Sequence, residues 1–178
     1  MTQRRGGWKA GSAKALMNLV ALTVTTIAAF AQAPADVALV VKGAVKQELR
    51  LGPADLKAMT RVKVTAKDHD GIAREYDGVA LQTLLGKAGA PQGSELRGKN
   101  MTLMVVAEAR DGYRAVFSLA ELDGDFAGLQ VVVADTEDGK PLDAQHGPLR
   151  LVVPGDKRQG RWVRMLKNLS VQKAGESQ

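Results

Sequence analysis

The stretch that decides the fold runs from Leu142 to Val171 and reads LDAQHGPLRLVVPGDKRQGRWVRMLKNLSV. It joins an apolar, strand-like run that ends at Pro154-Gly155 to one of the chain's two histidines and to six basic residues. These basic residues are Arg150, Lys157, Arg158, Arg161, Arg164 and Lys167. Arginine presents a fixed fork of donors that suits phosphates and carboxylates. The stretch therefore predicts either a solvated basic face or a binding site for an anion.

Arg150 differs from the other basic residues because it lies between two leucines of the strand-like run. A buried arginine needs a partner, so we expect it either to pair with Asp143 or Asp156 or to bind a ligand. Three further basic residues are predicted to be solvated loop charges: Lys157, Arg158 and Lys167.

The N-terminal segment, residues 1–31, has the pattern of a secretory signal peptide. A basic region precedes the apolar run ALMNLVALTVTTIAAF, and small residues around Ala31 are typical of a cleavage site. The pattern predicts a periplasmic or secreted protein with no stable membrane span after cleavage. An uncleaved N-terminal anchor is the alternative.

Composition limits the remaining chain further. Residues 1–31 hold four of the 25 basic residues and none of the acidic ones, which leaves 21 basic and 19 acidic residues. This near-neutral balance does not favour a nucleic-acid partner. The chain has no cysteine, so it can form no disulfide and offers no thiolate as a nucleophile or metal ligand. We expect a short linker over 32–36, one domain over 37–172 and a frayed tail over 173–178.

Hydrophobic patterning predicts an α+β domain that is mostly β, with mixed sheets and short helices. Ser118 and Glu121 form a capping-box pattern, and Gly89 suits a helix C-terminus. The sequence DHDG, residues 68–71, is predicted to be a plain hairpin turn. Helices are expected over 52–59, 79–89 and 119–122. Strands are expected over 37–43, 45–51, 61–67, 72–78, 101–107, 113–118, 129–135 and 149–153, with those at 101–107, 129–135 and 149–153 buried.

Several kinds of chemistry are disfavoured by the residues present. His69 and His146 are the only histidines, and neither lies near a nucleophile-elbow sequence, which argues against a Ser-His-Asp triad. Two isolated histidines without cysteines do not make the usual metal sites, so no metal ligand is predicted. The chain also lacks a glycine-rich phosphate loop between a strand and a helix.

Four motifs in order carry a resemblance to a known family. They read YDGVALQTLLGKAG (76–89), RDGYRAVFSLAEL (110–122), GKPLDAQHGPLRLVVPG (139–155) and RWVRMLKNLSV (161–171). With the upstream segment, the chain from Val37 to Val171 resembles the oxidoreductase molybdopterin-binding domain of the sulfite oxidase type. The resemblance implies that family's fold, and molybdopterin or a small anionic ligand as partner. The cofactor-binding positions it implies are His146, Arg150, Trp162, Val163 and Arg164.

The family's molybdenum ligand is a cysteine, and the corresponding stretch here, VTAKDHDGIAREYDGV (64–79), has none. The expectation is therefore an exported domain that binds a pterin or small anion without the usual oxygen-atom transfer. Whether it is an enzyme stays open. One alternative is an active molybdenum-dependent oxidoreductase that uses Asp68 or His69 in place of cysteine. Another is a cofactor-free interaction module whose basic segment docks an acidic protein partner or anionic lipid headgroups.

Overall fold

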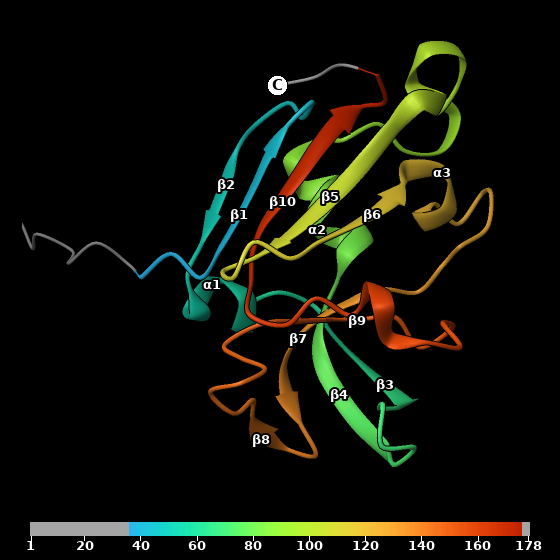
Figure 1. Cartoon of the computed structure of the whole chain (residues 1–178). Helices are drawn as coiled ribbons and strands as arrows, with labels where there is room; N and C mark the ends of the chain where they lie inside the picture. Colours follow the sequence, from blue (N-terminus) through green and yellow to red (C-terminus); the bar gives the residue numbers. More distant parts are fainter. Residues whose placement is uncertain (1–35, 176–178) are drawn as a thin grey trace, which may run out of the picture. The chain divides into compact units, whose positions relative to one another are not determined.

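The computed structural model describes residues 36–175. The predicted signal peptide and most of the predicted linker lie outside the described residues. Within 36–175 the chain forms two β-sheets, three short α-helices and three 3-10 helices, which confirms the predicted α+β, mostly β class (Figure 1). No helix of this part of the chain is long and apolar enough to cross a membrane.

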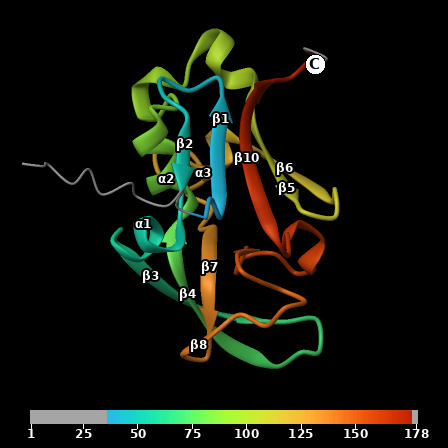
Figure 2. The same cartoon turned by 90° about the vertical axis from the view of Figure 1, so that its left-hand side faces the viewer.

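The first sheet has five strands in the order β2-β1-β10-β5-β6 (Figure 2). Their bounds are β1 Leu39–Gly43, β2 Leu49–Leu51, β5 Leu103–Ala109, β6 Arg114–Ser118 and β10 Leu166–Lys173. β10 pairs with β1 in parallel and with β5 in antiparallel fashion, which makes the sheet mixed. The end of the chain thus supplies the central strand of this sheet.

The second sheet carries the hairpin that the sequence predicts. Its path is β3-β4-β7-β8, and β9 pairs with β7. The bounds are β3 Arg61–Lys67, β4 Ala73–Ala80, β7 Val132–Glu137, β8 Lys140–Pro141 and β9 Arg150–Val152. A glycine is required in β4, because a Cβ at Gly78 would lie 2.1 Å from the Val133 carbonyl oxygen. The tip of the β3–β4 hairpin is the DHDG turn, and β9 lies in the basic stretch from Leu142 to Val171.

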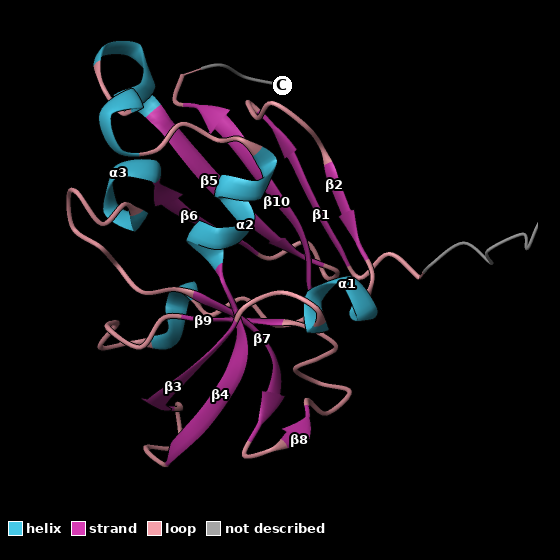
Figure 3. Cartoon of the chain, turned by 180° about the vertical axis from the view of Figure 1, so that it is seen from behind, coloured by secondary structure: helices cyan, strands magenta, loops and turns pink. Residues whose placement is uncertain are grey.

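The helices have the predicted signals at their ends. α1 (Pro53–Lys57) starts at a proline, and α2 (Leu81–Ala88) ends at Gly89 in the left-handed conformation with φ 73°. α3 (Leu119–Leu122) has the predicted capping box, in which the Glu121 amide donates to the Ser118 hydroxyl. α2 and α3 lie over one face of the five-stranded sheet (Figure 3). The remaining short turns are the 3-10 helices at Gly93–Glu95, Gly98–Thr102 and Gln159–Arg161.

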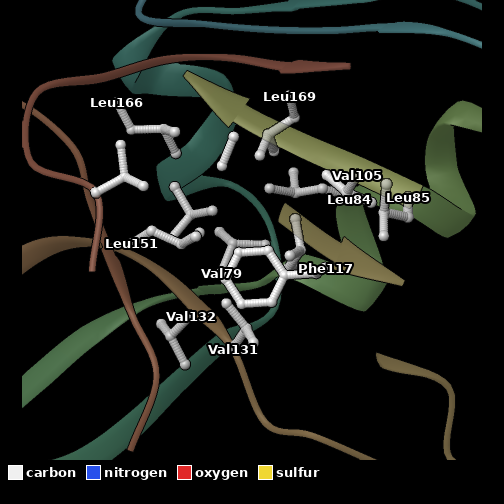
Figure 4. Close-up of a cluster of buried hydrophobic side chains, with 14 of the residues drawn as sticks. Val79, Leu84, Leu85, Val105, Phe117, Val131, Val132, Leu151, Leu166 and Leu169 are labelled. Carbon is white, nitrogen blue, oxygen red and sulfur yellow. The ribbon is translucent and has the colours of Figure 1, made fainter. Parts of the chain in front are cut away.

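One apolar core joins both sheets and α2. Figure 4 shows Phe117 from the first sheet close to Val79 from the second, with Leu84 and Leu85 of α2 nearby. All four side chains are at most 1% exposed. The core is contiguous, as expected for one domain of this length.

Two predictions about strands need correction. The strand around Val105 was expected to be buried on both faces, but residues of β5 alternate between buried and partly exposed. The helices cover only one face of the five-stranded sheet, so the side chains on the other face of β5 stay accessible. The strand expected over 45–51 is shorter, because only Leu49–Leu51 pair with β1.

Candidate functional site

Arg150 lies near the centre of the candidate site. It is 3% exposed on β9, and its guanidinium faces the tip of the β3–β4 hairpin. Nη1 donates to Asp68 Oδ2 at 2.8 Å and Nη2 donates to Asp68 Oδ1 at 3.0 Å. The predicted pairing with Asp143 or Asp156 is therefore wrong. Those two carboxylates bind nearer neighbours along the chain, His146 and Arg161.

The Arg150 guanidinium packs against two aromatic rings that also contact each other. Its Cζ lies 5.0 Å from the Trp162 ring centroid and 5.6 Å from that of Tyr76. The two rings meet edge to face at 5.7 Å, and Trp162 Nε1 donates to the Val153 carbonyl at 3.0 Å. Arginine stacked on aromatic faces in a low-dielectric site is held firmly. Trp162, which the resemblance implies as a cofactor-binding position, thus packs against Arg150.

Asp68 is held as a carboxylate by several donors. Besides the Arg150 fork, the Tyr76 hydroxyl donates to Oδ2 at 3.2 Å and the His69 amide donates to Oδ1 at 2.7 Å. The hydrogen bonds from Arg150 hold the pKa of this carboxyl well below its usual range, against the opposing effect of burial. Burial raises the pKa of Tyr76, so its hydroxyl stays protonated and donates. One donor remains unused, because Arg150 Nε is buried without a partner.

A pocket of about 770 Å³ opens beside this cluster. The residues that line it are Asp68, His69, Asp70, Arg74, Asp111, Tyr113, Glu137, Asp143, His146, Arg150, Gln159, Trp162 and Arg164. Four of the five sequence-predicted positions, His146, Arg150, Trp162 and Arg164, therefore line one pocket. The fifth, Val163, is fully buried, and its carbonyl accepts from the Leu151 amide. Its side chain lies in the core and not in the pocket.

Most charges of the pocket are already paired with one another. Arg74 forms an ion pair with Asp70 and another with Glu137 at 2.9 Å. His146 Nδ1 lies 2.9 Å from an oxygen of Asp143, and this contact lowers the pKa of the Asp143 carboxyl. Five carboxylates face three arginines and two histidines. The pocket is consequently less basic than the sequence suggested.

Arg164 is the exception among the arginines of the pocket. Its side chain is exposed, and within residues 36–175 it forms no hydrogen bond or ion pair. The solvated charges predicted at Lys157 and Arg158 are exposed as expected. Lys167 is instead part of β10 and lies 3.2 Å from Glu108 of β5. Arg164 is thus the pocket's available fixed cation.

The tip of the β3–β4 hairpin lies in the stretch 64–79, which corresponds to the stretch that carries the molybdenum-binding cysteine in the family. Asp68 and His69 both line the pocket, and the His69 ring forms no hydrogen bond within the described part of the chain. No group of three or more acidic or histidine side chains among residues 36–175 is arranged to hold a metal ion. Gln159, in the segment after β9, contacts the end of β3 beside the tip, because its Nε2 donates a hydrogen bond to the Lys67 carbonyl at 2.8 Å. Nothing in the sequence predicted this hydrogen bond.

Comparison with solved structures shows that the fold of this chain is similar to that of a known enzyme. The chain superposes on the crystal structure of the sulfane dehydrogenase SoxCD from Paracoccus pantotrophus with a TM-score of 0.59 and 22% sequence identity. The match covers 78% of this chain and 39% of that chain, so this chain spans about two fifths of its length. At this identity the likeness shows the fold alone. No curated protein sequence matches this chain.

The family follows from the sequence model that the chain matches. Residues 25–178 match the oxidoreductase molybdopterin binding domain, and the chain belongs to this family. The resemblance predicted from the four motifs is confirmed.

The pocket fits only part of the cofactor that the family name implies. A chain without cysteine offers no thiolate to molybdenum, and both oxygens of Asp68 are already bonded to Arg150. The donor set therefore does not fit a metal ion held in the family's manner. The pocket's volume does lie within the range of small-molecule sites, and Arg164 is available to a phosphate. Its carboxylates are suitable acceptors for the amino edge of a pterin.

Proposed function

We propose that this domain binds a molybdopterin-type pterin, or another small anion, in the pocket beside Arg150, and does so without thiolate-anchored oxygen-atom transfer. The observation that carries the proposal is Arg164, an exposed arginine that has no partner among residues 36–175 and lines a pocket of about 770 Å³. An unpaired guanidinium binds a phosphate through charge-assisted hydrogen bonds. His146 and Trp162 line the same pocket and would orient a flat ring.

The alternative of an active molybdenum enzyme with Asp68 as ligand is less well supported. To bind a metal, this carboxylate would have to leave Arg150, and the buried arginine would then lose its bidentate partner and keep only Glu137, 3.9 Å from Nη1. Losing one partner of a buried ion pair costs about 3 to 5 kcal/mol. The charge pattern therefore favours ligand binding without a side-chain metal ligand at Asp68.

Replacing Arg164 by alanine should weaken ligand binding while the fold stays intact. A hydrogen bond to a charged group contributes about 1.5 to 3 kcal/mol, which corresponds to roughly a 10- to 100-fold loss of affinity. The measurement is the pterin content of protein purified from a host that makes the cofactor, read by pterin fluorescence after oxidation, with molybdenum measured in parallel.

Arg158→Ala is the matched control, because Arg158 is an exposed arginine of the same segment that does not line the pocket. Pterin retained in Arg158→Ala and lost in Arg164→Ala would support the proposal. If the wild-type protein from a host that makes the cofactor contained no pterin, only the second part of the proposal, binding of another small anion, would remain. A phosphate titration tests that part. No response to phosphate either would favour the cofactor-free interaction module.

We further propose that the domain acts in the periplasm or outside the cell after removal of residues 1–31. The basic and apolar regions of this segment and the small residues around Ala31 support it. Intact mass of the protein recovered from the exported fraction is expected to correspond to a chain that begins at Gln32. A full-length chain that stays with the membrane fraction would indicate the uncleaved anchor instead.

A further inference from the structure

We infer that the Asp68 carboxylate fills an anion subsite of the pocket and keeps free anions from it, because it acts as an internal ligand of Arg150. The inference rests on the proposed pocket but concerns a different residue from the one that carries the proposed function. In this structure the Arg150 fork holds a carboxylate that belongs to the chain itself. A free phosphate or carboxylate can use this fork only if Asp68 leaves it.

The contacts around Asp68 are those of a bound anion. Its two oxygens accept from both terminal nitrogens of Arg150, from the Tyr76 hydroxyl and from the His69 amide, at 2.7 to 3.2 Å. Carboxylates and phosphates are recognised by this kind of set, a bidentate arginine with a hydroxyl and a backbone donor. The set therefore describes an anion subsite, and the hairpin tip fills it.

The tip is attached to the rigid sheet on both sides, which favours the internal ligand over a free one. The Asp68 amide donates to the Ile72 carbonyl at 3.0 Å and the Gly71 amide donates to the Asp68 carbonyl at 2.8 Å, so a tight turn fixes the carboxylate's position. A group tethered in this way competes as if present at millimolar concentration or more. Free anions are consequently directed to Arg164 in the wild-type protein.

Removing the charge of Asp68 should open the fork. In Asp68→Asn, Arg150 still packs against Tyr76 and Trp162, its remaining carboxylate neighbour is Glu137 at 3.9 Å from Nη1, and its Nε already lacks a partner. A buried cation in this state gains strongly from an incoming anion. We expect inorganic phosphate to bind Asp68→Asn at least about 10-fold more tightly than wild type, a change that corresponds to about 1.4 kcal/mol.

Asp135→Asn is the matched control for loss of a carboxylate that holds an arginine. Asp135 binds Arg61 in the same bidentate manner, its side chain is 18% exposed against 15% for Asp68, and it does not line the pocket. Phosphate is titrated into wild type, Asp68→Asn, Asp135→Asn and Asp68→Asn with Arg150→Met, at ionic strength matched with sodium chloride. The readouts are calorimetry and the phosphate-dependent shift in melting temperature.

The expected result is that the affinity for phosphate rises only in Asp68→Asn and that this rise disappears in the double variant. The inference would be overturned if the affinity for phosphate did not rise in Asp68→Asn, if it rose equally in Asp135→Asn, or if the rise persisted without Arg150. If Asp68→Asn melts cooperatively only with an anion present, phosphate but not chloride should restore the transition, and failure of phosphate to do so would count against it. Arg164→Ala separates the two proposals: wild-type binding lost in Arg164→Ala, with no gain in Asp68→Asn, would overturn the inference and leave the proposed function standing.

Discussion

Replacing Arg150 by alanine is expected to lower the free energy of unfolding by about 3 to 5 kcal/mol, since it leaves the Asp68 carboxylate without its ion-pair partner. The substitution also removes the guanidinium that packs against Trp162 and Tyr76, and it opens a void there. Urea denaturation at pH 7, followed by tryptophan fluorescence, measures the loss.

Arg61→Ala is the comparison for the Arg150 prediction. Arg61 also holds carboxylates, those of Asp77 and Asp135, but its side chain is 27% exposed against 4% for Arg150. More exposed ion pairs contribute less to stability. Replacing both Arg150 and Asp68 by apolar residues of similar size should restore much of the loss. A smaller loss for Arg150→Ala than for Arg61→Ala would contradict the assignment of a stabilising buried pair.

Stability is expected to fall steeply as the pH drops below about 4, the ordinary pKa of an aspartate. The hydrogen bonds from Arg150 hold the pKa of Asp68 below that value in the folded protein. The unfolded chain then binds more protons than the folded one over this range. The stabilisation is therefore fully present above about pH 5 and is lost as the pH falls toward the folded pKa. One such group contributes a slope of up to about 1.4 kcal/mol per pH unit.

Urea midpoints measured between pH 2 and pH 7 test this dependence. Asp68→Asn should show a flatter decline below pH 4 than wild type, because the variant has no carboxyl to protonate at that position. Asp70, whose pKa lies at about 2 because of its hydrogen bonds from Arg74, acts in the same direction but is exposed. Asp70→Asn should consequently change the slope less. Equal slopes for wild type and Asp68→Asn would show that another group governs the acid transition.

The local elements of the fold could be predicted from short patterns. The β3–β4 hairpin follows from the alternation in RVKVTAK and the DHDG turn, and the end of α2 follows from Gly89. The capping box of α3 needs only Ser118 and Glu121. β10 was not predicted as a strand, although it is central to the first sheet. Its burial does not alternate regularly, and its pairing with β1 joins residues more than 120 positions apart.

The candidate site shows the same division between local and distant information. The sequence by itself determined the family, the absence of a thiolate and the set of residues His146, Arg150, Trp162 and Arg164, because these depend on residue types in a fixed order. Only the tertiary structure decided that Val163 is in the core and that the partner of Arg150 is Asp68, 82 residues away. Sequence proximity favoured Asp143 and Asp156. The pairing of β9 with β7, and of β7 with β4, instead brings Arg150 to the hairpin tip.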